Sequence, residues 1–334
     1  MVYYDLLGFI ILLEVFLMLW WFIPAIIIVL LLGGAIPMLM KTVPIAKRVY
    51  LDQLVKTSPD KWGRVCSCPE NEEQKAMFDM GCEWAKTVAD KKQDVHIVHD
   101  GLNLYGEYYN LSDSKKCVLI LPGRCESLLY SYYFAPPYQK AGFNVLVIDQ
   151  RAHGNSDGMY NTIGVKESGD CIEWVKLLQS EFGIEEVYFH TICVGTATGL
   201  LAMVSPDCPD CVKGIVTEGC FTSFAETFRT HMIQLNRPVF PVKNLAMREI
   251  KKHTGTDVYK TAPIKVMPKL RQRALFLYGE QDVFSLPEKS KQLFEACGSP
   301  DKEIVWFSKG GHSHLRINNT EKYDNAIIDF LNRG

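Results

Sequence analysis

Long runs of charge of one sign are absent from this sequence. Its 36 lysine and arginine residues nearly balance its 38 aspartate and glutamate residues, which leaves a formal net charge of -2. A protein that wraps or reads nucleic acid needs a basic surface to neutralise phosphates, so this balance argues against nucleic acid as a partner. Internal repeats and low-complexity tracts are also missing.

Cysteine is sparse as well. Eleven cysteines in 334 residues are far below the density of a small disulfide scaffold, and their odd number leaves at least one thiol unpaired. A reducing compartment fits this usage best. The pairs at 66 and 68 and at 208 and 211 have neither the spacing nor the proximity in sequence of a closed zinc site, so we expect no bound metal.

Glycine-rich phosphate loops do not occur. Neither a Walker pattern nor a dinucleotide-binding fingerprint follows any of the apolar runs described below. We therefore expect no cofactor.

Charge is nearly missing from the N-terminus, where Glu14 is the only charged residue between positions 6 and 40. A helix of this length would reach roughly 50 Å, more than one hydrocarbon core of about 30 Å. Either one span occupies roughly 15–37, or Pro24 breaks the run into a re-entrant hairpin; we favour the single span. A cleavable signal peptide is not expected, because the run is too long and lacks a basic start.

Basic residues follow this run directly, at Lys41, Lys47, Arg48 and Lys56. The positive-inside rule then places the rest of the chain in the cytoplasm. We expect residues 1–45 to be a membrane anchor, 46–90 a linker and helical segment, and 91–334 the functional domain.

Short apolar runs alternate with longer amphipathic stretches after residue 90, which is the pattern of a mostly parallel sheet with helices on both faces. Eight strands are predicted, at 95–98, 102–109, 117–121, 144–148, 187–191, 214–218, 275–278 and 303–307. The first two form an antiparallel hairpin across Asp100 and Gly101. Helices are predicted at 72–90, 167–182, 194–204, 287–296 and 321–331.

One stretch interrupts this alternation. Residues 221–270 are punctuated by proline, partly helical in pattern and too long for an ordinary connection. We expect this insertion to be a lid over a site.

Polar motifs stand where several of the predicted strands end, and in a parallel sheet these ends collect ligands and catalytic groups. The motifs occupy residues 121–124, 149–156, 191–195, 279–282 and 310–312.

In this order they resemble the α/β-hydrolase family over roughly residues 90–334. Family members carry a nucleophile on a strained strand-to-helix turn, then an acid, then a histidine. The matching positions are Cys193, Asp282 and His312, and the backbone N–H groups of Arg124 and Val194 match the oxyanion hole. Residues 149–156 and 163–174 are also similar to the serine-aminopeptidase-like and prolyl-oligopeptidase-like branches.

The family pattern at the nucleophile is G-x-S-x-G, whereas this chain has Thr191 for the first glycine and Cys193 for the serine. A second alignment, 195–199, would put Ala197 at the nucleophile position and imply an inactive site. We prefer the first alignment, because it gives a strand and a helix of ordinary lengths.

Cysteine at this position is similar to dienelactone hydrolases and bile-acid-CoA amino acid N-acyltransferases. A thiolate is stabilised at a helix N-terminus and beside an imidazolium, and the turn supplies both. The resemblance implies a hydrolase that cleaves an acyl ester, thioester or related acyl bond of a small-molecule substrate through a Cys-His-Asp triad and an acyl-enzyme. The apolar N-terminal run makes this a membrane-anchored hydrolase. Two alternatives stay open: an acyltransferase that uses the same cysteine, and an inactive binding or scaffold protein.

The acid and the histidine of the triad each have an alternative in the sequence. Glu218, at the end of the strand before the insertion, is the reserve acid, and His314 is the alternative to His312. We prefer His312 because it directly follows Gly310 and Gly311, as the family histidine commonly follows glycine.

Overall fold

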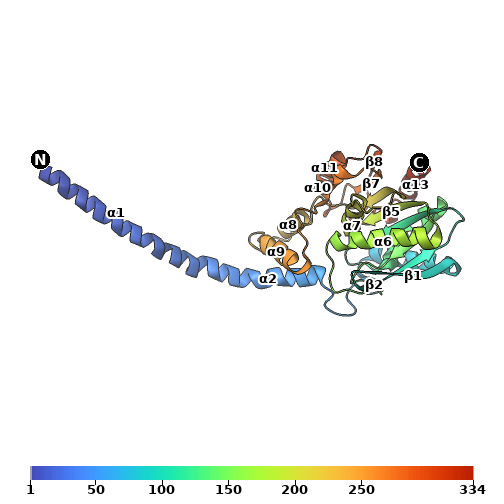
Figure 1. Ribbon diagram of the computed structural model, residues 1–334, viewed down its shortest axis with the longest axis horizontal. Coiled ribbons are helices and arrows are strands. Elements are labelled where there is room, and N and C mark those ends of the chain that lie inside the picture. Colours follow the sequence, from blue (N-terminus) through green and yellow to red (C-terminus); the bar gives the residue numbers. More distant parts are fainter. Residues whose placement is uncertain (1, 334) are drawn as a thin grey trace.

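A long N-terminal helix extends from a body of helices and strands (Figure 1). The structure is a computed structural model that describes the backbone of residues 2–333 and the side chains of residues 10–333. The long helix consists of α1 (Val2–Leu30), a π-helical segment (Leu31–Ala35) and α2 (Ile36–Leu54). Pro24 lies inside α1 and the chain does not reverse there, so the hairpin alternative is not the observed geometry.

The body is built on one eight-stranded sheet with the order β1-β2-β4-β3-β5-β6-β7-β8. β1 and β2 form the predicted antiparallel hairpin, β2 pairs with β4 in antiparallel fashion, and the other neighbours are parallel. The mostly parallel, eight-stranded sheet predicted from the sequence is confirmed. The strands are β1 (Lys92–His99), β2 (Leu102–Tyr109), β3 (Lys116–Leu121), β4 (Asn144–Ile148), β5 (Glu186–Ile192), β6 (Val212–Glu218), β7 (Arg273–Gly279) and β8 (Lys302–Phe307).

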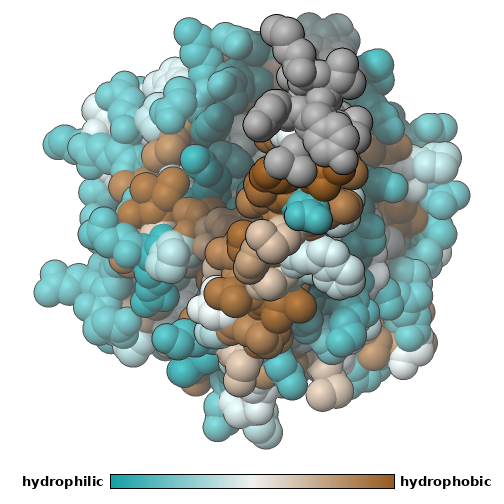
Figure 2. All heavy atoms as spheres, turned by 90° about the vertical axis from the view of Figure 1, so that its left-hand side faces the viewer, coloured by the Kyte–Doolittle hydropathy of each residue, from teal (hydrophilic) through white to brown (hydrophobic). Residues whose placement is uncertain are grey.

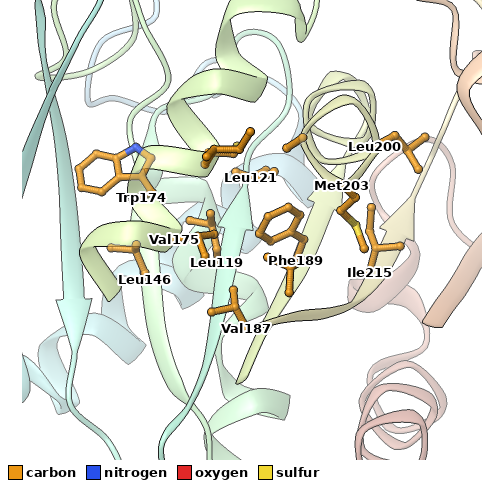
Figure 3. Close-up of a cluster of buried hydrophobic side chains, with 14 of the residues drawn as sticks. Leu119, Leu121, Leu146, Trp174, Val175, Val187, Phe189, Leu200, Met203 and Ile215 are labelled. Atoms are coloured by element: carbon orange, nitrogen blue, oxygen red, sulfur yellow. The ribbon is translucent and has the colours of Figure 1, made fainter. Parts of the chain in front are cut away.

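The central strands are apolar on both faces, because helices cover the sheet from both sides. In β3, Leu119 and Leu121 contribute to one buried cluster and Val118 and Ile120 to the other, as the alternation of side chains along a strand requires. Figure 3 shows the first cluster, in which Trp174 packs beside the leucines of the sheet.

Helices form the two outer layers. The first cluster is closed by α6 (Val165–Phe182), α7 (Val194–Met203), α10 (Pro263–Val266) and α11 (Pro287–Ala296). The second is closed by α3 (Glu72–Thr87), α4 (Leu128–Ser131), α5 (Pro136–Lys140) and α13 (Thr320–Asn332). The short α12 (Leu315–Asn318) precedes α13. Every predicted helix overlaps an observed one.

The insertion between β6 and β7 folds into two longer helices, α8 (Phe224–Gln234) and α9 (Val242–Thr254), followed by α10. In Figure 1 these helices lie at the end of the body from which the N-terminal helix extends. They form a separate buried cluster with the end of α2: Ala46, Tyr50 and Leu54 pack with residues of α9. The predicted boundary at residue 45 thus falls inside a helix whose last turns belong to the body.

The C-terminal end of α2 is fixed by a cation. The Nζ of Lys61 donates to the carbonyls of Leu51, Asp52 and Val55 at 3.0, 2.9 and 2.6 Å. These carbonyls lie at the end of the helix, where most carbonyls lack a partner within the helix and where the helix dipole favours positive charge. The segment after α2 is therefore held against the body rather than being a free linker.

Candidate active site

Cys193 lies on the turn between β5 and α7. Its backbone has φ 52° and ψ -114°, a conformation that residues with a side chain rarely adopt. The turn directs the residue toward a cavity that Cys193 lines, and the side chain is half-buried. Ala197, the nucleophile position of the alternative alignment, instead lies buried inside α7.

Space for the side chain of Thr191 is provided by a glycine on the facing helix. The Thr191 hydroxyl donates to the carbonyl of Val216 at 3.1 Å, and its methyl group points at Gly199 on α7. A Cβ at Gly199 would lie 2.9 Å from the Thr191 Cγ2 atom. The helix can therefore approach the strand although the first glycine of the family pattern is missing, because a glycine on the facing helix supplies the space.

The contact between Thr191 and Gly199 predicts how substitution of Gly199 changes stability with and without the Thr191 methyl group. We expect Gly199→Ala to lower the free energy of unfolding by about 1–3 kcal/mol, because the added methyl group overfills the strand–helix contact. In a Thr191→Ser background, which keeps the hydroxyl and removes the methyl group, the same change should cost clearly less. Denaturant unfolding of the four proteins in detergent measures this coupling; equal costs in both backgrounds would contradict it.

His312 and Asp282 form a hydrogen-bonded pair at the ends of β8 and β7. His312 Nδ1 lies 2.8 Å from Asp282 Oδ2. The other carboxylate oxygen, Oδ1, accepts from the backbone N–H groups of Phe284 and Ser285 at 2.8 and 2.7 Å. Because both oxygens are engaged, the carboxylate holds the imidazole in one orientation.

In the pair of His312 and Asp282, each residue shifts the pKa of the other in favour of its charged form. Burial alone would raise the pKa of Asp282, but its hydrogen bond with His312 and the charge of that ring lower it below the ordinary value. Burial would lower the pKa of His312, but the electrostatic interaction with the Cys193 side chain and the hydrogen bond with Asp282 raise it well above its ordinary value. The imidazolium form is therefore favoured beside Cys193.

Gly219, directly after β6, makes room for this ring. Its φ is +65°, and a Cβ built there would lie 2.8 Å from His312 Cε1. Its carbonyl accepts a hydrogen bond from the hydroxyl of Ser285 at 2.8 Å. Sequence reasoning missed both residues; the signal for Gly219 was its place directly after a predicted strand.

The backbone N–H groups of Arg124 and Val194 are available at this site. Among residues 2–333, neither amide donates to a protein acceptor. The loop that carries Arg124 is braced from two sides: His153 Nε2 contacts the Arg124 carbonyl, and Arg124 Nη1 donates to the carbonyl of Gln53 in α2 at 3.1 Å. Both predicted oxyanion positions line the same cavity as Cys193 and His312.

His314 and Glu218, the alternative histidine and acid, form hydrogen bonds with other residues. His314 Nε2 contacts Gln74 Oε1 at 2.7 Å, so this histidine faces α3 rather than Asp282. Glu218 accepts from the hydroxyl of Tyr323 at 2.6 Å and from the N–H of Leu315 at 3.1 Å. Burial raises the pKa of Glu218 to about 7. It ties α13 to the loop that carries His312.

The cavity has a volume of about 410 Å³, within the range of small-molecule sites. α8 supplies one wall and α2 another, and most of the lining side chains are apolar. The lining residues are Val49, Gln53, Arg124, Cys193, Val194, Phe221, Phe224, Thr227, Phe228, His231, Met232, Leu235, Arg237, Phe284, Ser285 and His312. The contribution of α2 was missed, although Ala46, Tyr50 and Leu54 repeat at helical spacing.

Metal-ligating groups do not gather in the part of the chain that the structure describes. In that part, no set of three or more His, Cys, Asp or Glu side chains is placed to hold an ion. The cysteines at 66, 68, 208 and 211 are free thiols.

Comparisons with known proteins agree with this architecture. A family model described as alpha/beta hydrolase fold matches residues 116–262. The uncharacterized protein YqkD of Bacillus subtilis is 23% identical over 233 residues, covering 69% of this chain and 76% of its own. The uncharacterized membrane protein YNL320W of Saccharomyces cerevisiae is 25% identical over 196 residues, 58% of this chain and 62% of its own.

Among solved structures, the Pyrococcus furiosus esterase Pf2001 superimposes with a TM-score of 0.60 at 21% identity. The superposition covers 75% of this chain and 95% of that one. The sheet order, the turn at Cys193 and these matches together show that the chain has the α/β-hydrolase fold.

Proposed function

We propose that this protein is a membrane-anchored hydrolase that cleaves acyl esters, thioesters or related acyl bonds through Cys193, His312 and Asp282. One observation carries the proposal: Cys193 occupies the strained turn at the wall of a cavity that His312 also lines, and Asp282 bonds the far side of the His312 ring. As part of this proposal we retain the resemblance of residues 149–156 to the serine-aminopeptidase-like and prolyl-oligopeptidase-like branches.

The chemistry would proceed in two steps. In the first, the Cys193 sulfur bonds to the acyl carbon, the bond to the leaving group breaks, and His312 gives its proton to the departing oxygen or sulfur. In the second, water attacks the acyl-cysteine thioester while His312 takes a proton from it, and the carboxylic acid leaves as the thiol reforms. The amides of Arg124 and Val194 would stabilise the oxyanion, each contributing about 2.7–4 kcal/mol.

Cysteine favours activated substrates. A thiolate is expelled from its tetrahedral intermediate more readily than an alkoxide or an amide anion, so attack on a poor leaving group returns to reactants. Thioesters, aryl esters and lactones suit the site best. The apolar walls of the cavity favour a hydrocarbon acyl group over a charged one.

Two observations support membrane anchoring. Among the described residues, one helix is long and apolar enough to cross a membrane, and its side chains from Ile10 to Met40 are almost all exposed. The yeast relative is named a membrane protein. The basic residues that follow, beginning at Lys41, favour a cytoplasmic body.

The proposal is tested with the full chain in detergent or nanodiscs and a panel of aryl esters and acyl thioesters. We expect release of free acid at a rate that saturates with substrate. Adding amine or alcohol acceptors separates hydrolysis from transfer: hydrolysis gives free acid throughout, whereas an acyltransferase would divert the acyl group to the acceptor. No turnover of any panel member by folded protein would contradict the proposal.

A further inference from the structure

The substrate cavity shares a wall with the N-terminal helix. Val49 and Gln53 of α2 line it, and Arg124, which also lines it, donates a hydrogen bond to the Gln53 carbonyl. The same helix continues without reversal into the apolar segment that ends at Met40. At about 1.5 Å per residue, Val49 lies only about 14 Å along the helix from Met40.

Helix α9 packs against α2 (Figure 1). Tyr50 stacks on His253 with ring centroids 4.8 Å apart. Near the C-terminal ends of both helices, Leu54 accepts from the backbone of the 161–162 segment at 2.8 Å, and Thr256 donates to this segment at 3.1 Å. The two helices therefore end at the same place in the fold.

This register fixes the level at which α9 begins. Counting back from the stacked pair of Tyr50 and His253, Val242 at the start of α9 lies level with roughly residue 39 of α2, since both helices rise about 1.5 Å per residue. The apolar run ends at Met40 and the first cation is Lys41. The α8–α9 loop, residues 235–241, therefore lies where the apolar part of the long helix gives way to charge.

The α8–α9 loop has the composition of a membrane-contacting segment. Phe240 is 69% exposed, Leu235 is 46% exposed, and Ile233 in the last turn of α8 is 49% exposed. Arg237 and Lys243 add positive charge, and among the described residues neither forms an ion pair. Figure 2 views the molecule along the N-terminal helix, whose apolar side chains point toward the viewer near the centre of the picture, with mostly polar side chains of the body around them.

The loop also borders the cavity, because Leu235 and Arg237 belong to its lining. We infer that the α8–α9 loop inserts into the surface of the bilayer that holds α1 and that the cavity takes its substrate from this bilayer: a long-chain acyl ester or thioester that resides in the membrane. The inference rests on the proposed function and names its substrate class. The acyl chain enters between α2 and α8 toward Cys193, and Arg237 faces the headgroup region, where phosphates complement its charge.

The test uses the full chain reconstituted in nanodiscs of phosphatidylcholine and phosphatidylglycerol. Two substrates are compared: a long-chain fluorogenic thioester dissolved in the bilayer, and a water-soluble acetyl aryl ester. The variant is Phe240→Asp, which is exposed and outside the cavity lining. The matched control is Val98→Asp on β1, at an equally exposed apolar residue of the sheet-edge hairpin (76% exposed).

We expect Phe240→Asp to lower kcat/KM for the bilayer substrate at least tenfold and to leave the soluble ester within about twofold, since a charged side chain is costly to bury in a membrane surface. Val98→Asp should leave both unchanged. Equal loss on both substrates, or no loss on either, would overturn the inference. If Cys193 is not needed for either substrate, the proposed function fails; if it is needed for the soluble ester and the bilayer thioester is not hydrolysed, only the inference fails.

A second measurement needs no variant. A photoactivatable phosphatidylcholine, with the reactive group near the carbonyl end of the acyl chain, is incorporated in the nanodisc and irradiated with the wild-type protein. We expect mass spectrometry to locate adducts on the peptide that contains residues 233–240 as well as on α1. Adducts confined to α1 and the first turns of α2 would show that the loop does not contact the bilayer.

Discussion

Replacing Cys193 with alanine is expected to lower kcat/KM for an acyl thioester by about 10⁴-fold or more. Removal of a nucleophile from a triad leaves only the contribution of the oxyanion donors and of substrate binding. The measurement is continuous release of free thiol from the thioester by the full chain. Because the site lies in a preformed cavity, we expect KM to change far less than kcat.

The matched control is Cys125→Ala. Cys125 is also a half-buried thiol and directly follows Arg124, so it tests whether any thiol near the cavity produces the activity. We expect this variant to stay within a few fold of the wild type. A Cys193→Ala protein with undiminished turnover, or equal losses in both variants, would mean that another group performs the attack.

The second prediction with a large expected effect concerns Asp282, the acid of the proposed triad. We expect Asp282→Asn to lower kcat by about 10⁴-fold, because an amide cannot both accept from His312 and stabilise its charge, and the wrong tautomer results. Glu218→Gln is the control: the amide can keep the bonds with Tyr323 and Leu315, so activity should change by only a few fold.

The pH profile gives this experiment a second readout. Asp282 helps to raise the pKa of His312, which favours the imidazolium to higher pH. If the imidazolium is the form that acts, activity falls as pH rises through that pKa. Asp282→Asn lowers the pKa of His312, so the basic limb of kcat/KM should move to lower pH. An unmoved limb, or a larger loss in Glu218→Gln, would assign the acid role to Glu218.

Much of the fold could be predicted from local patterns of apolar and polar residues in the sequence. β4 is five consecutive buried residues and was predicted over 144–148 because a strand covered on both faces is apolar throughout. β1 was predicted four residues short, three at its start and one, His99, at its end. Its first residues, from Lys92 to Asp94, are polar, and they are strand because they pair with Tyr109 and its neighbours in the hairpin.

The catalytic candidates were predictable because their chemistry and order are visible in the sequence. Cys193, Asp282 and His312 each follow a strand, and the shared edge of a parallel sheet brings such residues together. What compensates for Thr191 was not predictable, because Gly199 matters only through the packing of α7 against β5. A glycine within a helix pattern carries no sign of the side chain that faces it.

The walls of the cavity were the least predictable part. The insertion was expected to be a lid because of its length, but the face it presents to the cavity depends on how α9 packs against α2. The α2 contribution was missed because the segment after residue 45 was interpreted as a linker. Tertiary packing, rather than propensity, gives Val49 and Gln53 their place beside Cys193.

The central claim is that Cys193 carries the acyl group, and intact-mass analysis of the protein during turnover tests it most directly. The full chain is mixed with a panel of thioesters and aryl esters and quenched in acid within milliseconds to seconds. We expect a mass increase equal to one acyl group, located on the peptide containing Cys193, lost with time and absent from Cys193→Ala. Turnover without any adduct on Cys193, or an adduct that persists in Cys193→Ala, would contradict it.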